Sequence, residues 1–264
     1  MNNPAGKVYI GTILLEKNRW ATPKTPSYRV SEWLDRFAAA GFDGMELWEY
    51  HATRCGDDEL AALAASPVPV AVFNTYCGFE DDARAGRLRA AELTRRLGAG
   101  GVKFNVGKDP ARRGEYLHNL RAWAEMLPDR CRVLCECHGG TILERPADAR
   151  AFFDEAGAER FGVIVHCFAD DPAVLTEWLD RFGPAVAHAH VALRDAGRSV
   201  RLDRRGHHVE DVLAILHDAG YAGSFTLEFT EGTGEPDESI EPLWRAALAD
   251  LRFLRERSDG RRDG

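Results

Sequence analysis

Two residues able to carry protons or bind a metal ion, Glu136 and His138, lie two positions apart in the stretch 132–140. The stretch alternates like a short strand, which places both side chains on one face and Cys135 and Cys137 on the other. A carboxylate and an imidazole at a strand end are costly to bury unless they are paired or hold a metal ion. This pair therefore indicates a functional site, and similar residues end three later strand patterns.

The elements that must position these residues follow a regular order. Eight strand patterns alternate with helical patterns, without a linker or a break in composition. That order is typical of parallel strands joined by right-handed crossovers. An open doubly wound sheet shares the order, but eight units in 264 residues favour an α/β fold of the closed (β/α)8 TIM barrel type. We predict a single-domain barrel over residues 1–258 and a frayed tail over 259–264.

Hydrophobic periodicity and the positions of proline and glycine give the expected bounds of these elements. The expected strands are 8–14, 43–48, 67–75, 101–107, 132–140, 161–168, 185–193 and 224–229. The expected helices are 27–40, 57–65, 80–97, 114–127, 146–156, 172–182, 209–219 and 239–255.

The polar faces of the last strands should point into the barrel, because the more apolar face of each strand meets the helices. The expected inward residues are Ile164, His166 and Phe168 on the sixth strand, Val186, His188 and His190 on the seventh, and Thr226, Glu228 and Thr230 on the eighth. Four consecutive strands thus bring Glu136, His166, His190 and Glu228 to the C-terminal end, where barrel enzymes build their sites.

Two imidazoles and two carboxylates suit one divalent ion such as Mn²⁺, Zn²⁺, Co²⁺ or Fe²⁺ better than Ca²⁺, which prefers oxygen ligands alone. Each residue alone also has a structural interpretation. A single strand histidine is more often a hydrogen-bonded core residue than a ligand, and Glu228 alone could pair with an arginine. The prediction of a metal site therefore depends on the coincidence of all four.

The chain resembles the xylose isomerase-like TIM-barrel superfamily, which contains the sugar phosphate isomerases and epimerases. The resemblance rests on residues 41–48 (GFDGMELW), on Glu136-Cys-His138 followed by Gly-Gly, on His190 and on residues 219–228 (AGYAGSFTLE). It implies one divalent metal ion held from strands five to eight. The sixth-strand ligand of that pattern is usually an Asp within Asp-x-x-His, and His166 replaces it here. One negative charge is lost, which favours Zn²⁺, Fe²⁺ or Co²⁺ over Mg²⁺.

The resemblance implies an isomerase or epimerase that moves a proton next to the carbonyl of a small sugar, polyol or keto-sugar. Glu136 and Glu228 would transfer the proton, and His138 would be a further acid or base, or would orient a ligand. The expected substrate-binding residues are Glu46, Trp48, Lys103, Asn105, His188 and Arg194. For Lys103 and His188, an internal ion pair or hydrogen bond is an equal alternative.

Three other functions stay open. A metal-dependent dehydratase of the 3-dehydroshikimate or inosose type would use the same ligands. A barrel without metal could bind a sugar or a partner. A nuclease like endonuclease IV is disfavoured, because the first four strands supply no histidine and His51 is expected in a loop. The basic loop Arg194 to Arg205 is either a solvated lid or a site for a substrate anion.

Composition sets the remaining expectations. The net charge of −8 disfavours binding to nucleic acid or an anionic membrane, and no apolar run reaches the length of a membrane span. No signal peptide is read at the N-terminus, and six cysteines without a CxxC motif are expected to stay reduced in a cytoplasmic protein. A small-molecule substrate is the expected partner, and a homo-oligomer is possible by analogy with relatives.

Overall fold

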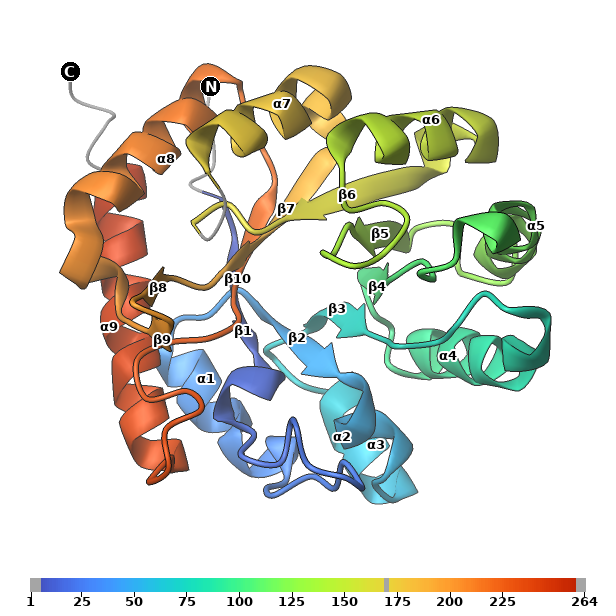
Figure 1. Ribbon diagram of the computed structural model, residues 1–264. Helices are drawn as coiled ribbons and strands as arrows, with labels where there is room; N and C mark the ends of the chain where they lie inside the picture. The colour runs from blue at the N-terminus through green and yellow to red at the C-terminus, as the bar shows by residue number, and fades with distance from the viewer. Residues whose placement is uncertain (1–5, 169–170, 260–264) are drawn as a thin grey trace.

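The computed structural model describes residues 6–168 and 171–259. Eight parallel strands form a closed barrel in the order β1-β10-β7-β6-β5-β4-β3-β2. The predicted single-domain (β/α)8 TIM barrel is therefore confirmed. Figure 1 shows the strands at the centre and the helices as a ring around them.

The strands are shorter than predicted. Hydrogen-bonded pairing stops at Glu136 on β5 and at Val165 on β6, so His138 and His166 lie beyond their strands. The barrel strands are β1 Val8–Gly11, β2 Gly44–Trp48, β3 Val70–Asn74, β4 Gly101–Phe104, β5 Arg132–Glu136, β6 Phe161–Val165, β7 Val186–Val191 and β10 Ser224–Leu227.

The helices begin and end where the local sequence dictates. α6 starts at Pro146 and stops at Gly157, whose φ of 100° few other residues adopt. Asp171 caps α7 by accepting a hydrogen bond from the backbone N–H of Ala173. The helices are α1 Leu34–Ala40, α2 Glu49–Thr53, α3 Asp57–Ala64, α4 Arg84–Arg96, α5 Arg113–Ala124, α6 Pro146–Ala156, α7 Pro172–Phe182, α8 Gly206–Asp218 and α9 Ile240–Asp259.

Two apolar clusters fill the molecule. The larger lies between strands and helices and includes Val133 and Cys135. The smaller, inside the barrel, consists of Val72, Leu134, Ile164 and Ala187. A side chain at Gly162 would collide with Leu134 and Ala187, because an added Cβ would lie 2.8 and 3.0 Å from them. The inner cluster forms an apolar floor beneath the polar residues of the C-terminal end.

Two of the expected inward residues face the other way. Val186 packs in the outer cluster and Ala187 in the inner one, because β7 contains a bulge opposite Val163 and Ile164. A bulge adds one residue to the strand and interrupts the alternation. Phe168 also packs in the outer cluster, since it follows the end of β6.

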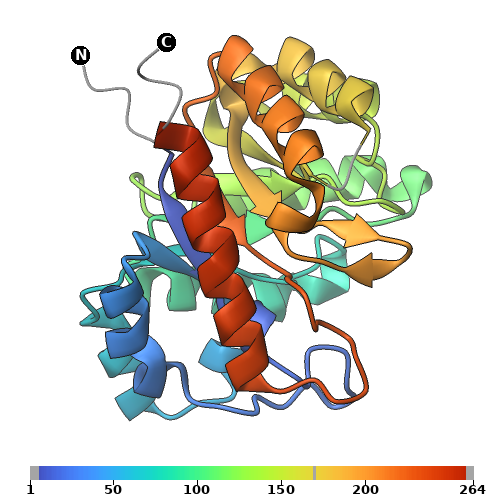
Figure 2. The same cartoon turned by 90° about the vertical axis from the view of Figure 1, so that its left-hand side faces the viewer.

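The C-terminal elements close the ring. Figure 2 shows α9 running along the barrel between α1 and α8, with the hairpin of β8 Arg194–Asp195 and β9 Arg198–Ser199 projecting beside them. α9 extends to Asp259, one residue into the predicted tail, and residues 260–264 lie outside the described residues. All six cysteines are free thiols. No helix of the described residues is long and apolar enough to span a membrane.

Candidate metal centre

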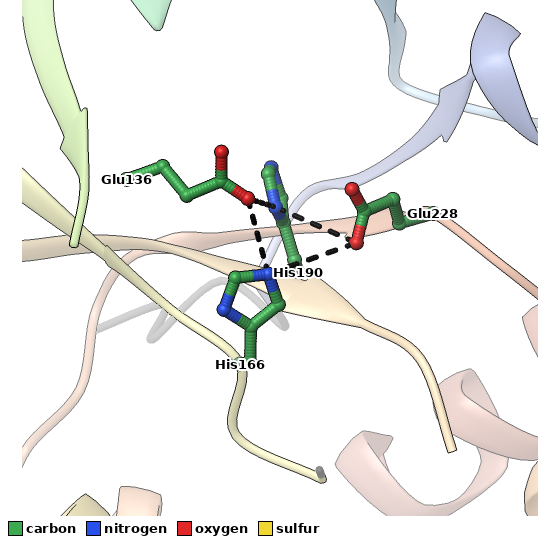
Figure 3. Close-up of side chains that lie close together, drawn as sticks. All are labelled: Glu136, His166, His190 and Glu228. Carbon is green, nitrogen blue, oxygen red and sulfur yellow. Dashed lines mark ion pairs between the residues drawn. The ribbon is translucent and has the colours of Figure 1, made fainter. Parts of the chain in front are cut away.

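The structure brings Glu136, His166, His190 and Glu228 together at the C-terminal end of the barrel. Glu136 ends β5, His166 follows β6, His190 lies in β7 and Glu228 follows β10. One potential ligand atom from each lies within 4.8 Å of every other. Figure 3 shows the four side chains pointing toward a common centre.

The contacts within this cluster are asymmetric. Oε1 of Glu136 lies 3.1 Å from Nε2 of His166 and 3.3 Å from Nδ1 of His190. Oε2 of Glu228 lies farther away, 3.8 and 3.7 Å from the same two nitrogens. Nδ1 of His190 is buried and has no hydrogen-bond partner. An unsatisfied imidazole nitrogen beside two carboxylates is the donor set that a divalent ion needs. The four residues are therefore chemically suited to hold one.

The surroundings shift the pKa values of all four side chains. Burial opposes ionisation of Glu136, but Lys103 and the histidines outweigh it and hold its pKa well below the usual value. For Glu228, burial prevails and the pKa is raised. Burial should lower the pKa of both histidines, yet the neighbouring carboxylates outweigh it and raise the pKa of His166 and, more strongly, of His190. Protons thus compete for the positions that a cation would take.

Lys103 and Asn105 contact Glu136. The Lys103 ammonium lies 2.6 Å from Oε2 of Glu136, and the Asn105 amide donates to the same oxygen at 3.0 Å. Asn105 also accepts a hydrogen bond from Lys103 at 2.6 Å. Both were predicted to bind substrate, but Lys103 is fully buried, and the internal ion pair is what the structure contains.

Glu46 and His188 lie deeper in the barrel than the four-residue cluster, and both are fully buried. Glu46 contacts His190 and His188 at 3.1 and 3.2 Å. Trp48 is buried as well, against the rings of Tyr50 and His51. These three predicted substrate-binding residues present no open surface, and contact with substrate stays a prediction for them.

Two predicted site residues are exposed to solvent. The His138 ring lies 6.2 Å from the His166 ring, and its Nδ1 lies 2.7 Å from the Gly139 carbonyl oxygen. The expectation that His138 continues the inner face of the strand is wrong, because the strand ends at Glu136. Arg194 lies in the β8–β9 hairpin.

Three other arginines of the predicted basic loop, Arg198, Arg201 and Arg204, lie close to acidic residues. Arg198 lies 3.5 Å from Glu235, and Arg204 lies 3.4 Å from Glu231. Arg201 pairs with Asp203 two positions along the chain, at 3.0 Å. These pairs reduce the positive charge that the loop offers to an anion, so the solvated-lid interpretation gains support.

Sequence reasoning missed Tyr76 and misplaced His51. Tyr76 follows β3, is 45% exposed, and its ring centroid lies 4.4 Å from the Lys103 ammonium. An aromatic residue directly after a strand was the available signal. His51 lies in α2 rather than in a loop, with its nitrogens at 2.9 Å from Thr12 and 3.2 Å from Glu16.

A groove gives access to the cluster from the side of α6 and α7. Its volume of about 580 Å³ is within the range of small-molecule sites. His166 is the one residue of the cluster that lines this groove. The lining also includes Cys137, Gly139, Glu144, Arg145 and Trp178.

The family model described as xylose isomerase-like TIM barrel matches residues 34–257. The chain belongs to this family. The family includes enzymes, and the resemblance stated from the sequence motifs is confirmed. No curated protein sequence matches the chain.

Solved structures of the same fold are similar over almost the whole chain. D-psicose 3-epimerase from Clostridium cellulolyticum H10 has a TM-score of 0.68 and 14% identity, covering 94% of this chain and 98% of its own. The probable 3-DHS dehydratase AsbF from Bacillus anthracis has a TM-score of 0.67 and 15% identity, with the same coverage. A xylose isomerase-like barrel from Mycobacterium smegmatis, in complex with magnesium, has a TM-score of 0.63 and 14% identity, covering 98% and 99%. At these identities the likeness establishes the fold alone.

Proposed function

We propose that the chain is a divalent-metal-dependent isomerase or epimerase acting next to the carbonyl of a small sugar, polyol or keto-sugar. The observation that carries this proposal is the cluster of Glu136, His166, His190 and Glu228 with the unsatisfied Nδ1 of His190. Family membership and the similar D-psicose 3-epimerase support it. A partner other than a small substrate is not needed for this function.

The four clustered residues would hold the metal ion. A divalent ion bound there polarises a carbonyl oxygen as a Lewis acid, which acidifies the adjacent C–H. The similar barrel in complex with magnesium supports a divalent ion. The two imidazoles favour Mn²⁺, Zn²⁺, Co²⁺ or Fe²⁺ as its identity.

The two carboxylates differ in their freedom to accept a proton. Both oxygens of Glu136 have partners, Oε2 with Lys103 and Asn105 and Oε1 near the histidines. Among the described residues, nothing donates a hydrogen bond to the carboxylate of Glu228, whose nearest nitrogens lie 3.7 and 3.8 Å away. Glu228 is therefore the better proton carrier, while Glu136 is held as a ligand.

This difference favours a dehydratase as the second candidate. Epimerisation by two bases requires a free carboxylate on each side of the substrate carbon, whereas elimination of water requires one base and one acid. Glu228 would remove the proton, and the exposed His138 beside His166 could donate to the leaving hydroxyl. The similar fold of the probable 3-DHS dehydratase supports this alternative.

Metal analysis of protein purified without chelator tests the proposal. We expect about one divalent ion per chain, lost in the double variant Glu136→Gln with Glu228→Gln. Less than about 0.2 ion per chain, unchanged in that variant, would leave only a barrel that binds a sugar or partner without metal.

A substrate screen in D₂O distinguishes the two reactions. Ketoses, inososes and 3-dehydroshikimate are incubated with the metal-loaded protein and followed by NMR and mass spectrometry. Deuterium incorporated next to a carbonyl supports the isomerase or epimerase, and loss of water supports the dehydratase. Absence of both with every compound counts against proton transfer.

A further inference from the structure

A third carboxylate lies behind the candidate metal centre. Both oxygens of Glu46 are 3.1 Å from Nε2 of His190, on the opposite side of the ring from Glu136 and Glu228. His190 and Glu46 are both buried, and the Nδ1 atom of His190 faces the cluster without a hydrogen bond. The two ring nitrogens of His190 thus have different environments.

The environment of Glu46 determines which nitrogen of His190 carries the proton. Glu46 accepts a hydrogen bond from the Asn74 amide, and its oxygens face the ring nitrogens of His188 and His190, so it acts as a carboxylate that only accepts hydrogen bonds. Nε2 of His190 must therefore donate, and a neutral imidazole then has its lone pair on Nδ1. That lone pair points to Glu136 and Glu228, where the metal ion is proposed.

Glu46 is itself held in place by other donors. The Asn74 amide donates to Oε1 at 2.7 Å, and Nε2 of His188 lies 3.2 Å from Oε2. His188 is fixed in turn, with Nδ1 at 2.8 Å from the Ser224 hydroxyl and Nε2 at 2.9 Å from the Thr226 hydroxyl. Glu46 therefore cannot turn away from His190 without leaving these buried groups unpaired.

We propose that Glu46 is a positioning residue that holds His190 in the Nε2-protonated form, with Nδ1 directed at the metal ion. The inference rests on the proposed metal-dependent function and assigns Glu46 a role other than substrate binding. A carboxylate behind a histidine ligand orients the ring and strengthens its lone pair. Glu46, His188 and His190 could also form a second metal site, since their ligand atoms lie within 4.8 Å of one another. Their direct hydrogen bonds favour the positioning role.

The variant Glu46→Gln tests the proposal with Co²⁺ as the probe. An amide has one acceptor oxygen, whereas the carboxylate accepts from Asn74 and His190 on one oxygen and from His188 and His190 on the other. Either orientation of the amide sets its NH₂ group against a donor and weakens the constraint on His190. We expect Co²⁺ binding about 10–100-fold weaker than in the wild type, with shifted visible absorption bands. The variant Glu46→Asp, which keeps the charge, should recover part of the affinity.

The matched control is Glu16→Gln. Glu16 is also buried and lies 3.2 Å from a histidine, His51, but it does not contact the cluster. Its substitution should leave the Co²⁺ affinity and spectrum unchanged. Wild-type affinity and spectrum in Glu46→Gln would overturn the proposal. Two Co²⁺ ions per wild-type chain, with only one in the variant, would also overturn it, because Glu46 would then be a ligand of a second metal site. Failure of the wild type to bind any Co²⁺ would instead overturn the proposed function.

A second measurement needs no folded Glu46 variant. In wild-type protein labelled with ¹⁵N-histidine and loaded with Zn²⁺, two-bond ¹⁵N–¹H spectra report which ring nitrogen carries hydrogen. The His190 signal is assigned by its loss in His190→Gln. We expect a proton on Nε2 and a metal-bound Nδ1, and the reverse pattern would contradict the role of Glu46.

Discussion

Two buried polar networks lie at the C-terminal end of the barrel, one around His51 and one around His190. In the His51 network, His51 contacts Thr12 and Glu16 through its two nitrogens. Glu16 also accepts hydrogen bonds from the backbone N–H groups of Asn18 and Ser27 at 2.7 and 2.8 Å. Every polar side-chain atom of His51 and Glu16 therefore has a partner. In the His190 network, Nδ1 of His190 has none.

The two networks also differ in charge balance. In the His51 network, buried Arg19 pairs with Glu238 at 2.7 Å, which leaves Glu16 as the one carboxylate without a cation. In the His190 network with its histidines neutral, as metal ligation requires, Glu46, Glu136 and Glu228 face one cation, Lys103, which leaves an excess of two negative charges. That is the charge a divalent ion neutralises. Burial at strand ends is common to both networks, and Oε1 of Glu238 also lacks a hydrogen bond, so the excess charge is what distinguishes the binding site from the structural network.

Removing Lys103 should give the largest effect, because it leaves the buried carboxylate of Glu136 without its cation. We expect Lys103→Met to destabilise the metal-free protein by about 3–5 kcal/mol, the usual cost of breaking a buried pair. Urea denaturation measures the loss. A divalent ion should restore part of the stability, and adding Glu136→Gln should restore much of it. An equal loss in the single and double variants would show that Lys103 does not balance Glu136.

Metal affinity should fall as the pH falls. The pKa values of His166 and His190 are raised above 6.5 by the neighbouring carboxylates, so protons compete for both rings already at neutral pH. Each proton displaced by the metal weakens binding by about tenfold for each pH unit below the pKa. Zn²⁺ competition against a chelator of known affinity at pH 8, 7 and 6 measures this dependence. A constant affinity over this range would contradict the protonated histidines.

The His51 network should affect stability without affecting metal binding. The Thr12 hydroxyl accepts from the Trp48 backbone N–H at 2.9 Å and contacts His51. Thr12→Val leaves both without that partner, at a cost of about 1–3 kcal/mol. Thermal denaturation measures the loss, and metal content per chain should equal that of the wild type. A loss of metal in this variant would remove the distinction between the two networks.

Local signals in the sequence predicted much of the fold, and long-range contacts explain most of the errors. α6 and α7 have their predicted bounds, because proline starts each helix and glycine follows it. The strand ends were placed too late, since alternation continues beyond Glu136 and Val165 while pairing with the neighbours stops. The bulge at Ala187 leaves no mark in the alternation of apolar residues.

In the candidate site too, the sequence predicts some contacts and leaves out those that depend on long-range packing. The approach of Glu136, His166, His190 and Glu228 follows from strand order and from the C-terminal ends of parallel strands. The pairing of Lys103 with Glu136 depends on how β4 and β5 are aligned and on side-chain conformation, which one sequence does not specify. The sequence predicts Glu46 as a substrate-binding residue, but its contact with His190 crosses from β2 to β7 and has no local signal.

A further buried carboxylate, Asp250 on α9, should give the smallest effect. It accepts hydrogen bonds from the Thr230 hydroxyl at 2.5 Å and the Leu202 N–H at 2.8 Å. Burial outweighs these bonds and raises its pKa to about 7. The folded protein therefore binds this proton more tightly than the unfolded chain. Its stabilising effect is complete below about pH 4 and is lost as the pH rises through about 7.

Between pH 6 and pH 8 the loss for Asp250 amounts to about 1 kcal/mol. Asp250→Asn keeps an acceptor for Leu202 but cannot ionise, so its stability relative to the wild type should rise by this amount over the same interval. Urea denaturation at both pH values measures the difference. Identical pH dependence in the two proteins would mean that Asp250 is ionised in the fold, held by its two hydrogen bonds as Glu16 is held by its own.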